Sequence, residues 1–176
     1  MDEWGIDFNT ALSDCGIKTS DFKDHESRLS AERVAQLIEY CNRVKSRHDF
    51  AILIAENFHP GTFHVLGYAM MVSNSLFNAF VRIVRYKKVV SNTCSIKIEE
   101  STDVCKLVLN SFLHESTNRP VLSDNSIITF IATLVKFARE TSSHNFRPSN
   151  VNLNWSNTHQ KSHFLDDFFG CPVNFD

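Results

Sequence analysis

The chain has 176 residues, of which 43% are hydrophobic and 22% are charged, and its formal net charge is −2. This length fits one domain with a real hydrophobic core, and the composition is that of a globular protein rather than a disordered one. Its 5 glycines are too few for collagen-like repeats or an all-β sandwich, and its 18 basic and 20 acidic residues lack the basic excess of nucleic-acid-binding surfaces.

Helical patterns fill the first part of the chain. Residues 1–29 mix aspartates with apolar residues, which predicts a lead-in of short helical turns. Ser30 suits a helix N-cap, and apolar residues recur behind it at helical spacing as far as Cys41. A second helix is expected to begin near Asp49 and to end before the break at Pro60.

The pattern changes from helical to alternating in the middle of the chain. A dense apolar run covers residues 63–72, and Ser75 is expected to cap the helix that follows it. The basic residues of that helix gather near its C-terminal end, where cations complement the helix dipole. Strict alternation over residues 94–99 predicts a strand with one buried face, and residues 104–109 complete an antiparallel hairpin.

The last part of the chain adds two helices and two strands. Ser123 or Asp124 can cap a long helix with an apolar face, and alternation over residues 150–155 predicts another strand. A short helix then ends at Gly170, and a final strand starts at Val173. The order of these elements predicts a single α/β (α+β) domain in which helices flank a small mixed or antiparallel sheet.

The cysteines and the hydropathy indicate the compartment. No pair among Cys15, Cys41, Cys94, Cys105 and Cys171 has C-x-x-C spacing, and their number is odd, so neither a disulfide framework nor a zinc module is expected. We expect buried free thiols in a reducing cytoplasm. No apolar run reaches the roughly 18 residues of a membrane helix, and the acidic start of the chain argues against a secretory signal.

A metal site is one candidate for chemistry. His59 and His64 lie five residues apart, and His48 is near them in the sequence. Metal sites in proteins usually need three or four ligands with supporting outer contacts, and no Cys or carboxylate pair completes this set. We interpret these side chains as solvated or hydrogen-bonded loop histidines and expect no metal and no cofactor.

Two nucleophile patterns have simpler interpretations. Ser20 and Lys23, together with Ser123-Asp124-Asn125, match the S-x-x-K and S-D-N motifs of penicillin-recognising enzymes, but the K-T-G motif is missing. Both matches fall where helix caps and turns favour Ser and Asp. The chain's 5 cysteines and 8 histidines will also form chance pairs, and no local signature marks an activated thiol. We therefore expect no enzymatic activity.

Two segments carry a family resemblance. The first is Leu66-Gly67-Tyr68-Ala69 with a break at Ser73, a helix over residues 76–85, and the strand at 96–99. The second is the string Phe-Gly-Cys-Pro-Val-Asn-Phe over residues 169–175. With the upstream helices in the expected order, these segments resemble the arabinose-binding-type N-terminal domain of AraC-type transcription regulators over residues 12–176. That family commonly has a proline where Asn74-Ser75 stands here.

The resemblance implies a regulatory role without catalysis. Residues 30–176 are expected to bind a small effector between helices and sheet, and Gly67 is expected to allow a close approach of its helix. Such regulators continue into a DNA-binding domain with two helix-turn-helix units, for which 176 residues leave no room. We therefore expect the sensing part of a regulator, in contact with promoter DNA only through the absent domain and with no membrane. The alternative is a dimerisation or protein-interaction module that binds no small molecule.

The chain is rich in phenylalanine, with 15 of these residues, and their positions suggest where an effector would bind. The helices predicted around residues 63–90 and 124–141 carry several of them, and Arg82 or Arg85 could pair with the carboxylate of an amphipathic effector. The simpler interpretation of both arginines is a solvated helix face. The candidate lining residues are Tyr68, Met71, Phe77, Phe80, Arg82, Arg85, Phe130, Leu134, Phe137 and Trp155.

Overall fold

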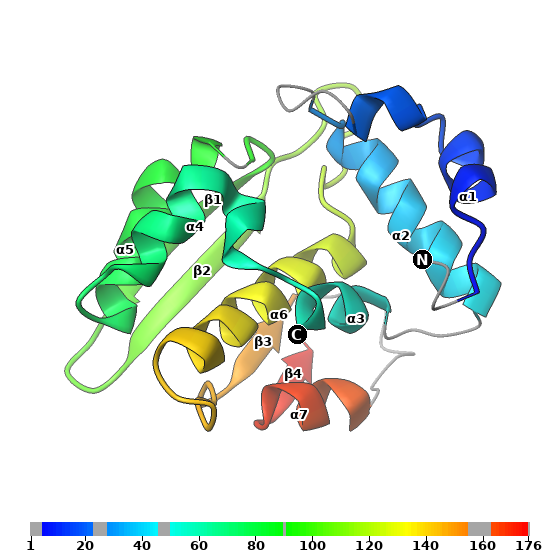
Figure 1. Cartoon of the computed structure of the whole chain (residues 1–176). Coiled ribbons are helices and arrows are strands. Elements are labelled where there is room, and N and C mark those ends of the chain that lie inside the picture. The colour runs from blue at the N-terminus through cyan, green and yellow to red at the C-terminus, as the bar shows by residue number, and fades with distance from the viewer. Residues whose placement is uncertain (1–4, 23–27, 46–49, 90, 155–162, 176) are drawn as a thin grey trace.

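A computed structural model describes residues 5–22, 28–45, 50–89, 91–154 and 163–175, and it confirms a mixed α/β domain (Figure 1). Trp155, one of the candidate lining residues, lies outside the described residues. The N-terminal elements are α1 (Phe8–Asp14), η2 (Thr19–Phe22), α2 (Ala31–Lys45), α3 (Phe50–Glu56), η3 (Pro60–Phe63), α4 (His64–Met71), α5 (Leu76–Tyr86) and η4 (Lys87–Val89). The remaining elements are β1 (Cys94–Glu100), β2 (Cys105–Ser111), α6 (Asp124–Thr141), β3 (Val151–Leu153), α7 (His163–Phe169) and β4 (Val173–Phe175).

The strands form two small sheets within the described residues. The predicted hairpin is confirmed: β1 and β2 pair antiparallel, with Ile96 opposite Leu109. Ile96 is buried and its neighbour Lys97 is exposed, as the alternation predicted. The short strands β3 and β4 pair in parallel, with Val151 opposite Val173, and α7 makes the connection between them. The predicted sheet is therefore divided into one antiparallel and one parallel pair.

Serine caps set where three of the helices begin. The hydroxyl oxygens of Ser30, Ser75 and Ser123 each accept a hydrogen bond from the backbone N–H three residues later, at 3.3, 3.2 and 3.2 Å. These bonds satisfy backbone donors that a helix leaves without an internal partner. All three caps were predicted, and Ser123 rather than Asp124 caps α6.

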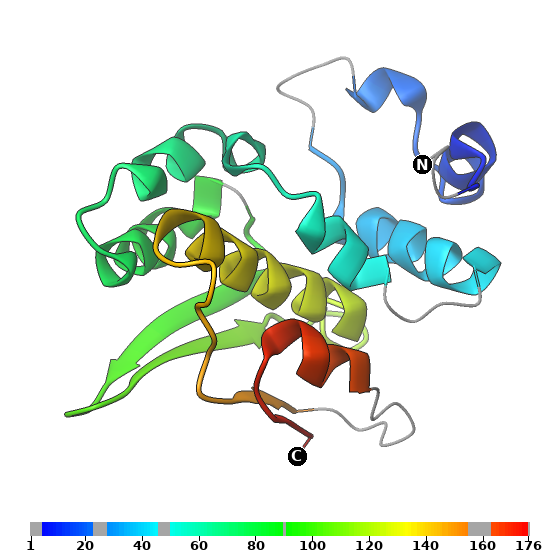
Figure 2. The same ribbon diagram turned by 60° about the horizontal axis from the view of Figure 1, so that its bottom comes forward.

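The long helix α6 organises the core. It runs through the middle of the molecule, with α3 and α7 on one part of it and α4 and α5 on another (Figures 1 and 2). Ala132 and Phe137 of this helix are fully buried, in two different apolar clusters. The helices α1 and α2 form a further cluster at the N-terminal side, around Ile38 and Cys41.

Two glycines hold close junctions. A Cβ atom on Gly67 would lie 1.8 Å from the carbonyl oxygen of Pro60, so the predicted close approach of α4 is confirmed, and η3 is its neighbour. Gly170 has φ +69°, a left-handed conformation that suits glycine at the end of α7.

The Arg139 side chain joins α6 to the end of α7. Its guanidinium donates hydrogen bonds to the carbonyls of Phe168 and Phe169, at 2.6 and 3.2 Å.

All five cysteines are free thiols, but their burial differs from the prediction. Cys15, Cys41 and Cys94 are buried, and burial raises the pKa of the Cys41 thiol to about 11. The expectation of a buried thiol is wrong for Cys105, which is exposed at the start of β2, and Cys171 is half-buried. Cys105 lies beside the turn of the hairpin, where it pairs with Glu100.

Candidate functional site

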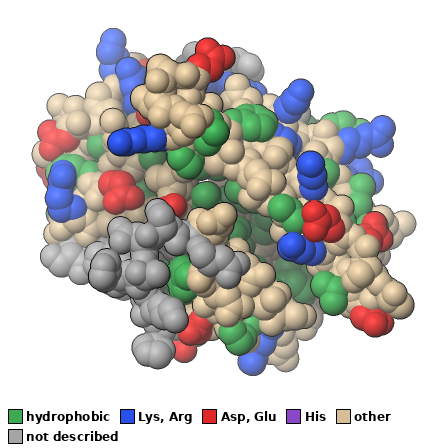
Figure 3. Space-filling view, turned by 180° about the vertical axis from the view of Figure 1, so that it is seen from behind, with side chains coloured by type: hydrophobic (Ala, Val, Ile, Leu, Met, Phe, Trp, Pro, Cys, Tyr) green, Lys and Arg blue, Asp and Glu red, His purple; other side chains and the backbone are tan. Residues whose placement is uncertain are grey.

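The surface is hollowed on the side facing away from the view of Figure 1. Figure 3 shows hydrophobic side chains gathered in and around a central hollow on that face. Concave apolar surfaces with a few polar groups are the usual sites for small molecules.

A groove of about 440 Å³ lies where α6 meets three consecutive elements from the earlier part of the chain. The helix α2 forms one wall, α3 and η3 form another, and α6 forms the third. Its lining residues are Val34, Ile38, Ile54, Asn57, Phe58, Thr62, Phe63, Ser126, Thr129, Phe130 and Thr133. Its volume lies within the range found for sites that hold small organic molecules.

Helical spacing explains why these residues face the groove. Val34 and Ile38 are four residues apart on α2, so they lie one above the other on the same face. Thr129 and Thr133 have the same spacing on α6. Between α3 and α4 the break at Pro60 turns the chain back, so that the rings on either side of it meet. The Phe58 and Phe63 ring centroids are 4.8 Å apart.

Most hydrogen-bond donors among the polar side chains of the groove already have acceptors within the protein. The Thr129 and Thr133 hydroxyls donate to backbone carbonyls one turn earlier in α6, at 2.8 and 2.7 Å. The Asn57 side-chain amide donates to the carbonyl of Leu53 at 2.9 Å. The hydroxyl and amide oxygens keep lone pairs that can accept further hydrogen bonds. The groove is therefore apolar with a small number of acceptor groups.

The lining residues of this groove, all within the described part of the chain, include no Lys, Arg, His, Asp or Glu. A buried charge without a partner is costly, so this lining disfavours a charged group of either sign. Acidic groups lie at the N-terminal end of α6 and on the adjoining part of α2. There Asn125 donates to Glu39 of α2 at 2.6 Å, and burial raises the pKa of Asp124, which Glu39 raises further.

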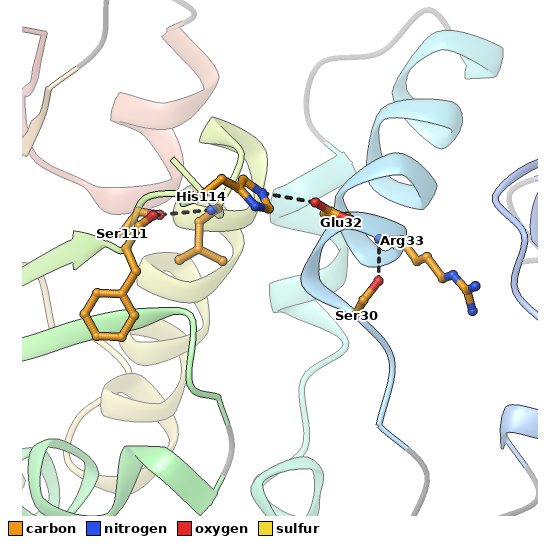
Figure 4. Close-up of polar contacts among 7 residues, drawn as sticks. Ser30, Glu32, Arg33, Ser111 and His114 are labelled. Atoms are coloured by element: carbon orange, nitrogen blue, oxygen red, sulfur yellow. Dashed lines mark hydrogen bonds and ion pairs between the residues drawn. The ribbon is translucent and has the colours of Figure 1, made fainter. Parts of the chain in front are cut away.

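Polar contacts beside the groove tie α2 to the segment after β2. His114 and Glu32 point toward each other, with 3.1 Å between Nε2 and Oε1 (Figure 4). The Ser111 hydroxyl oxygen accepts a hydrogen bond from the backbone N–H of Leu122 at 2.9 Å, which closes the loop that carries His114 (Figure 4). Together with Asn125, these contacts join α2 to the rest of the domain along the side that holds the groove.

Another hollow, of about 510 Å³, lies beside α1 and η2. It is lined only by residues from 9 to 20, a single stretch of chain. A hollow within one segment does not bring distant elements together, and a ligand there would contact none of the larger core. The groove between α2 and α6 is therefore the better candidate, although it is slightly smaller.

The structure brings together only part of the predicted lining. Phe130 lines the groove. Leu134 and Phe137 are buried in the core cluster below α4 and α5, and Phe80 packs against that cluster. These four aromatic and aliphatic residues thus share one region around α6, but only one of them reaches the groove.

The remaining predicted residues lie on the outside of α4 and α5. Tyr68, Met71, Phe77, Arg82 and Arg85 are all exposed, and none of them lines the groove. Ligand binding by these residues stays a prediction. The arginines occupy the solvated helix face that their simpler interpretation gave them.

Sequence analysis missed the groove residues on α2, α3 and η3. A signal was available on α6, where Thr129 and Thr133 interrupt the predicted apolar face at a spacing of four residues. Nothing in the sequence shows that this stripe faces Val34 and Ile38, because that pairing depends on the packing of α2 against α6.

The described residues form neither a metal-binding cluster nor a membrane-spanning helix. No three His, Cys, Asp or Glu side chains in the described ranges are placed to hold a metal ion, so His59 and His64 have no third ligand there. No helix in the same ranges is long and apolar enough to cross a membrane.

Comparison with known proteins identifies a family for the chain. The family model described as the arabinose-binding domain of AraC transcription regulators, N-terminal, matches residues 5–176. A search of curated proteins found no match. The family match covers every element described above and all residues of the groove.

Proposed function

The chain belongs to the family of N-terminal arabinose-binding domains of AraC transcription regulators, and from this premise we propose that it senses a small effector in the groove between α2 and α6. The observation that carries the proposal is that this groove is lined both by the consecutive elements α2, α3 and η3 and by α6, which lies much later in the sequence. A ligand held there would contact all of them at once. The groove lies within residues 30–176, which supports the assignment of that range as the effector-binding domain.

We propose that the effector is uncharged, with an apolar body and one or more hydroxyl groups. The groove's lining carries no charge, and its Thr and Asn oxygens can accept hydrogen bonds from ligand hydroxyls. An amphipathic carboxylate paired with Arg82 or Arg85 is the other version of the proposal. The exposed position of both arginines, outside the groove lining, favours the uncharged effector over the carboxylate.

Effector binding would act on transcription through α2. A ligand can shift a two-state equilibrium only by its difference in affinity for the two states. In the groove, it would contact Val34 and Ile38 on one side and α6 on the other, so it would favour one placement of α2. We propose that this placement is passed to a DNA-binding domain, which makes the contact with promoter DNA. The family is a regulatory ligand-binding family rather than an enzyme family, and we propose no catalytic role.

The free thiols support a reducing cytoplasm as the compartment. In an oxidising compartment, an exposed thiol such as that of Cys105 would be prone to form a disulfide with another molecule. We therefore propose a cytoplasmic regulator.

Thermal unfolding with matched ligands tests the proposed effector class. The panel consists of a medium-chain primary alcohol, the carboxylate and the ammonium ion of the same chain length, and arabinose. We expect the alcohol to raise the melting temperature in a concentration-dependent manner, because a ligand that binds only the folded state stabilises it. The carboxylate and the ammonium ion should have little effect. Stabilisation by the carboxylate alone would favour the version with Arg82 or Arg85.

The alternative function, a dimerisation module without a ligand, makes a different prediction. In that case no member of the panel shifts the melting temperature, and sedimentation shows a dimer at micromolar concentration. A homodimer that is also stabilised by the alcohol would combine both roles.

A further inference from the structure

The helix α4 is apolar on both sides. Leu66, Gly67 and Met70 face the core and are buried. On the opposite side, Val65 is 73% exposed, and Val72, which caps the C-terminal end of the helix, is 76% exposed. A helix that is hydrophobic all round is normally buried, so the outward side of α4 is an uncovered apolar surface.

The neighbouring helix α5 extends this surface. Both views of the ribbon show α4 and α5 side by side (Figures 1 and 2). Phe77 and Val81 are four residues apart on α5 and are both exposed, although Ala79 and Ile83 of the same helix are buried. We call the exposed apolar residues of the two helices the α4–α5 face: Val65, Tyr68, Met71, Val72, Phe77 and Val81.

The segment that contains both helices carries charge of one sign only. The sequence has no Asp or Glu between Glu56 and Glu99, although the whole chain is slightly acidic with a net charge of −2. Arg82 and Arg85 are exposed in the last turns of α5. Among the described residues no carboxylate pairs with either arginine, and the Arg85 guanidinium lies over the Tyr86 ring at 5.6 Å. The α4–α5 face is therefore flanked by unpaired cations at one end.

We propose that the α4–α5 face docks an amphipathic helix of a partner protein, with an acidic flank that pairs with Arg82 and Arg85. An amphipathic helix presents apolar residues at positions i, i+3, i+4 and i+7, which matches an apolar surface made by two adjacent helices. Arginine forms paired hydrogen bonds with carboxylates, and aromatic residues, Met and Arg are enriched at protein interfaces. This inference is independent of the effector groove.

The distribution of charge favours an acidic partner helix over a second copy of the chain, a nucleic acid or a membrane as the molecule that covers this face. A second copy of the chain would bring the same acid-free helices together, so these helices would offer no carboxylate to either arginine. Nucleic acid would leave the exposed Val65, Tyr68 and Val72 without apolar contacts. An anionic membrane would engage cations all around the apolar surface. On these two helices the cations lie only toward the C-terminal end of α5, since α4 has no Lys or Arg.

Fluorescence anisotropy with three synthetic peptides tests the proposal. The peptides share one leucine face and helical length; the first has a glutamate flank, the second a lysine flank, and the third is a scrambled version of the first. We expect the glutamate peptide to bind the whole chain at least about tenfold more tightly than either of the others, a difference of roughly 1.4 kcal/mol. Added salt should weaken this binding, since exposed charges are screened.

Variants locate the binding on the α4–α5 face. R82E/R85E should lose affinity for the glutamate peptide and gain affinity for the lysine peptide. Val72→Ser should weaken binding of the glutamate peptide, and Val44→Ser, at an exposed valine of α2, should not. All of these positions are exposed, so melting temperatures should change little and will report any loss of folding.

Four outcomes would overturn the proposal. These are equal binding of the glutamate and lysine peptides, equal binding of the scrambled peptide, and charge reversal at Arg82 and Arg85 without effect. The fourth is that the parent chain does not bind the glutamate peptide but self-associates or binds vesicles of anionic phospholipid, and that Val72→Ser abolishes this association. In that case the surface is a dimer or membrane contact.

Discussion

Gly67 sets how closely α4 lies against η3. Its missing side chain leaves room for the carbonyl of Pro60, which a Cβ atom would approach to 1.8 Å. The atom in the way belongs to the backbone and cannot rotate aside. Gly61 in the same junction differs, because a Cβ there would meet only side-chain atoms of His59 and Tyr68, at 3.1 and 3.2 Å.

Gly67→Ala should therefore destabilise the domain. We expect a loss of about 1–3 kcal/mol in the free energy of unfolding, the usual range for overpacking, measured by urea unfolding of the variant and the parent chain. Gly61→Ala is the matched control and should lose less, since flexible side chains can move out of the way. Equal losses in both variants would show that backbone crowding at Gly67 is not the cause.

At the scale of elements, both favourable and unfavourable polar contacts connect α2 with α6 and the loop after β2. Asn125 donates to Glu39, and His114 lies against Glu32, but Asp124 and Glu39 are like charges at the same junction. Burial raises the pKa of the Asp124 carboxyl, and Glu39 raises it further. The folded state therefore holds the Asp124 proton more tightly than the unfolded state does.

The raised pKa of Asp124 predicts in which direction the stability of the domain changes with pH. A carboxyl whose pKa is higher in the folded state destabilises that state once it is ionised; the effect is absent below the unfolded pKa and complete above the folded pKa. Asp124→Asn should therefore raise the melting temperature at neutral pH, and this gain should shrink as pH falls through the pKa of Asp124. Thermal unfolding of both proteins across acidic and neutral pH measures it. A gain independent of pH would contradict the electrostatic explanation.

Local signals in the sequence predicted elements better than they predicted packing. The Ser75 cap and the hairpin of β1 and β2 depend on residues close in the chain, and both are confirmed. The groove depends on Val34 meeting Thr129, residues far apart in sequence, and no local pattern fixes that contact. Helical spacing alone also could not separate Phe137, which is fully buried, from residues that line a groove.

At the scale of the whole molecule, α6 contributes to the two largest apolar clusters, one with α3 and α7 and one with α4 and α5. The helix α2 lies near one end of α6, with the groove between them, and its other side packs in the N-terminal cluster around Cys41. A ligand in this groove would stabilise the contact between α2 and α6 and would leave the α4–α5 face free for a partner. The proposed effector groove and the proposed partner surface therefore lie on different elements of the domain.

The central claim is that the effector binds between α2 and α6. The most direct measurement is calorimetric titration of the medium-chain alcohol into the parent chain, Val34→Phe and Val44→Phe. Both valines are exposed on α2, at 37% and 47%, but only Val34 lines the groove. We predict that Val34→Phe reduces the affinity by about tenfold or more and that Val44→Phe leaves it unchanged. Equal affinity in the parent chain and Val34→Phe would contradict the groove as the effector site.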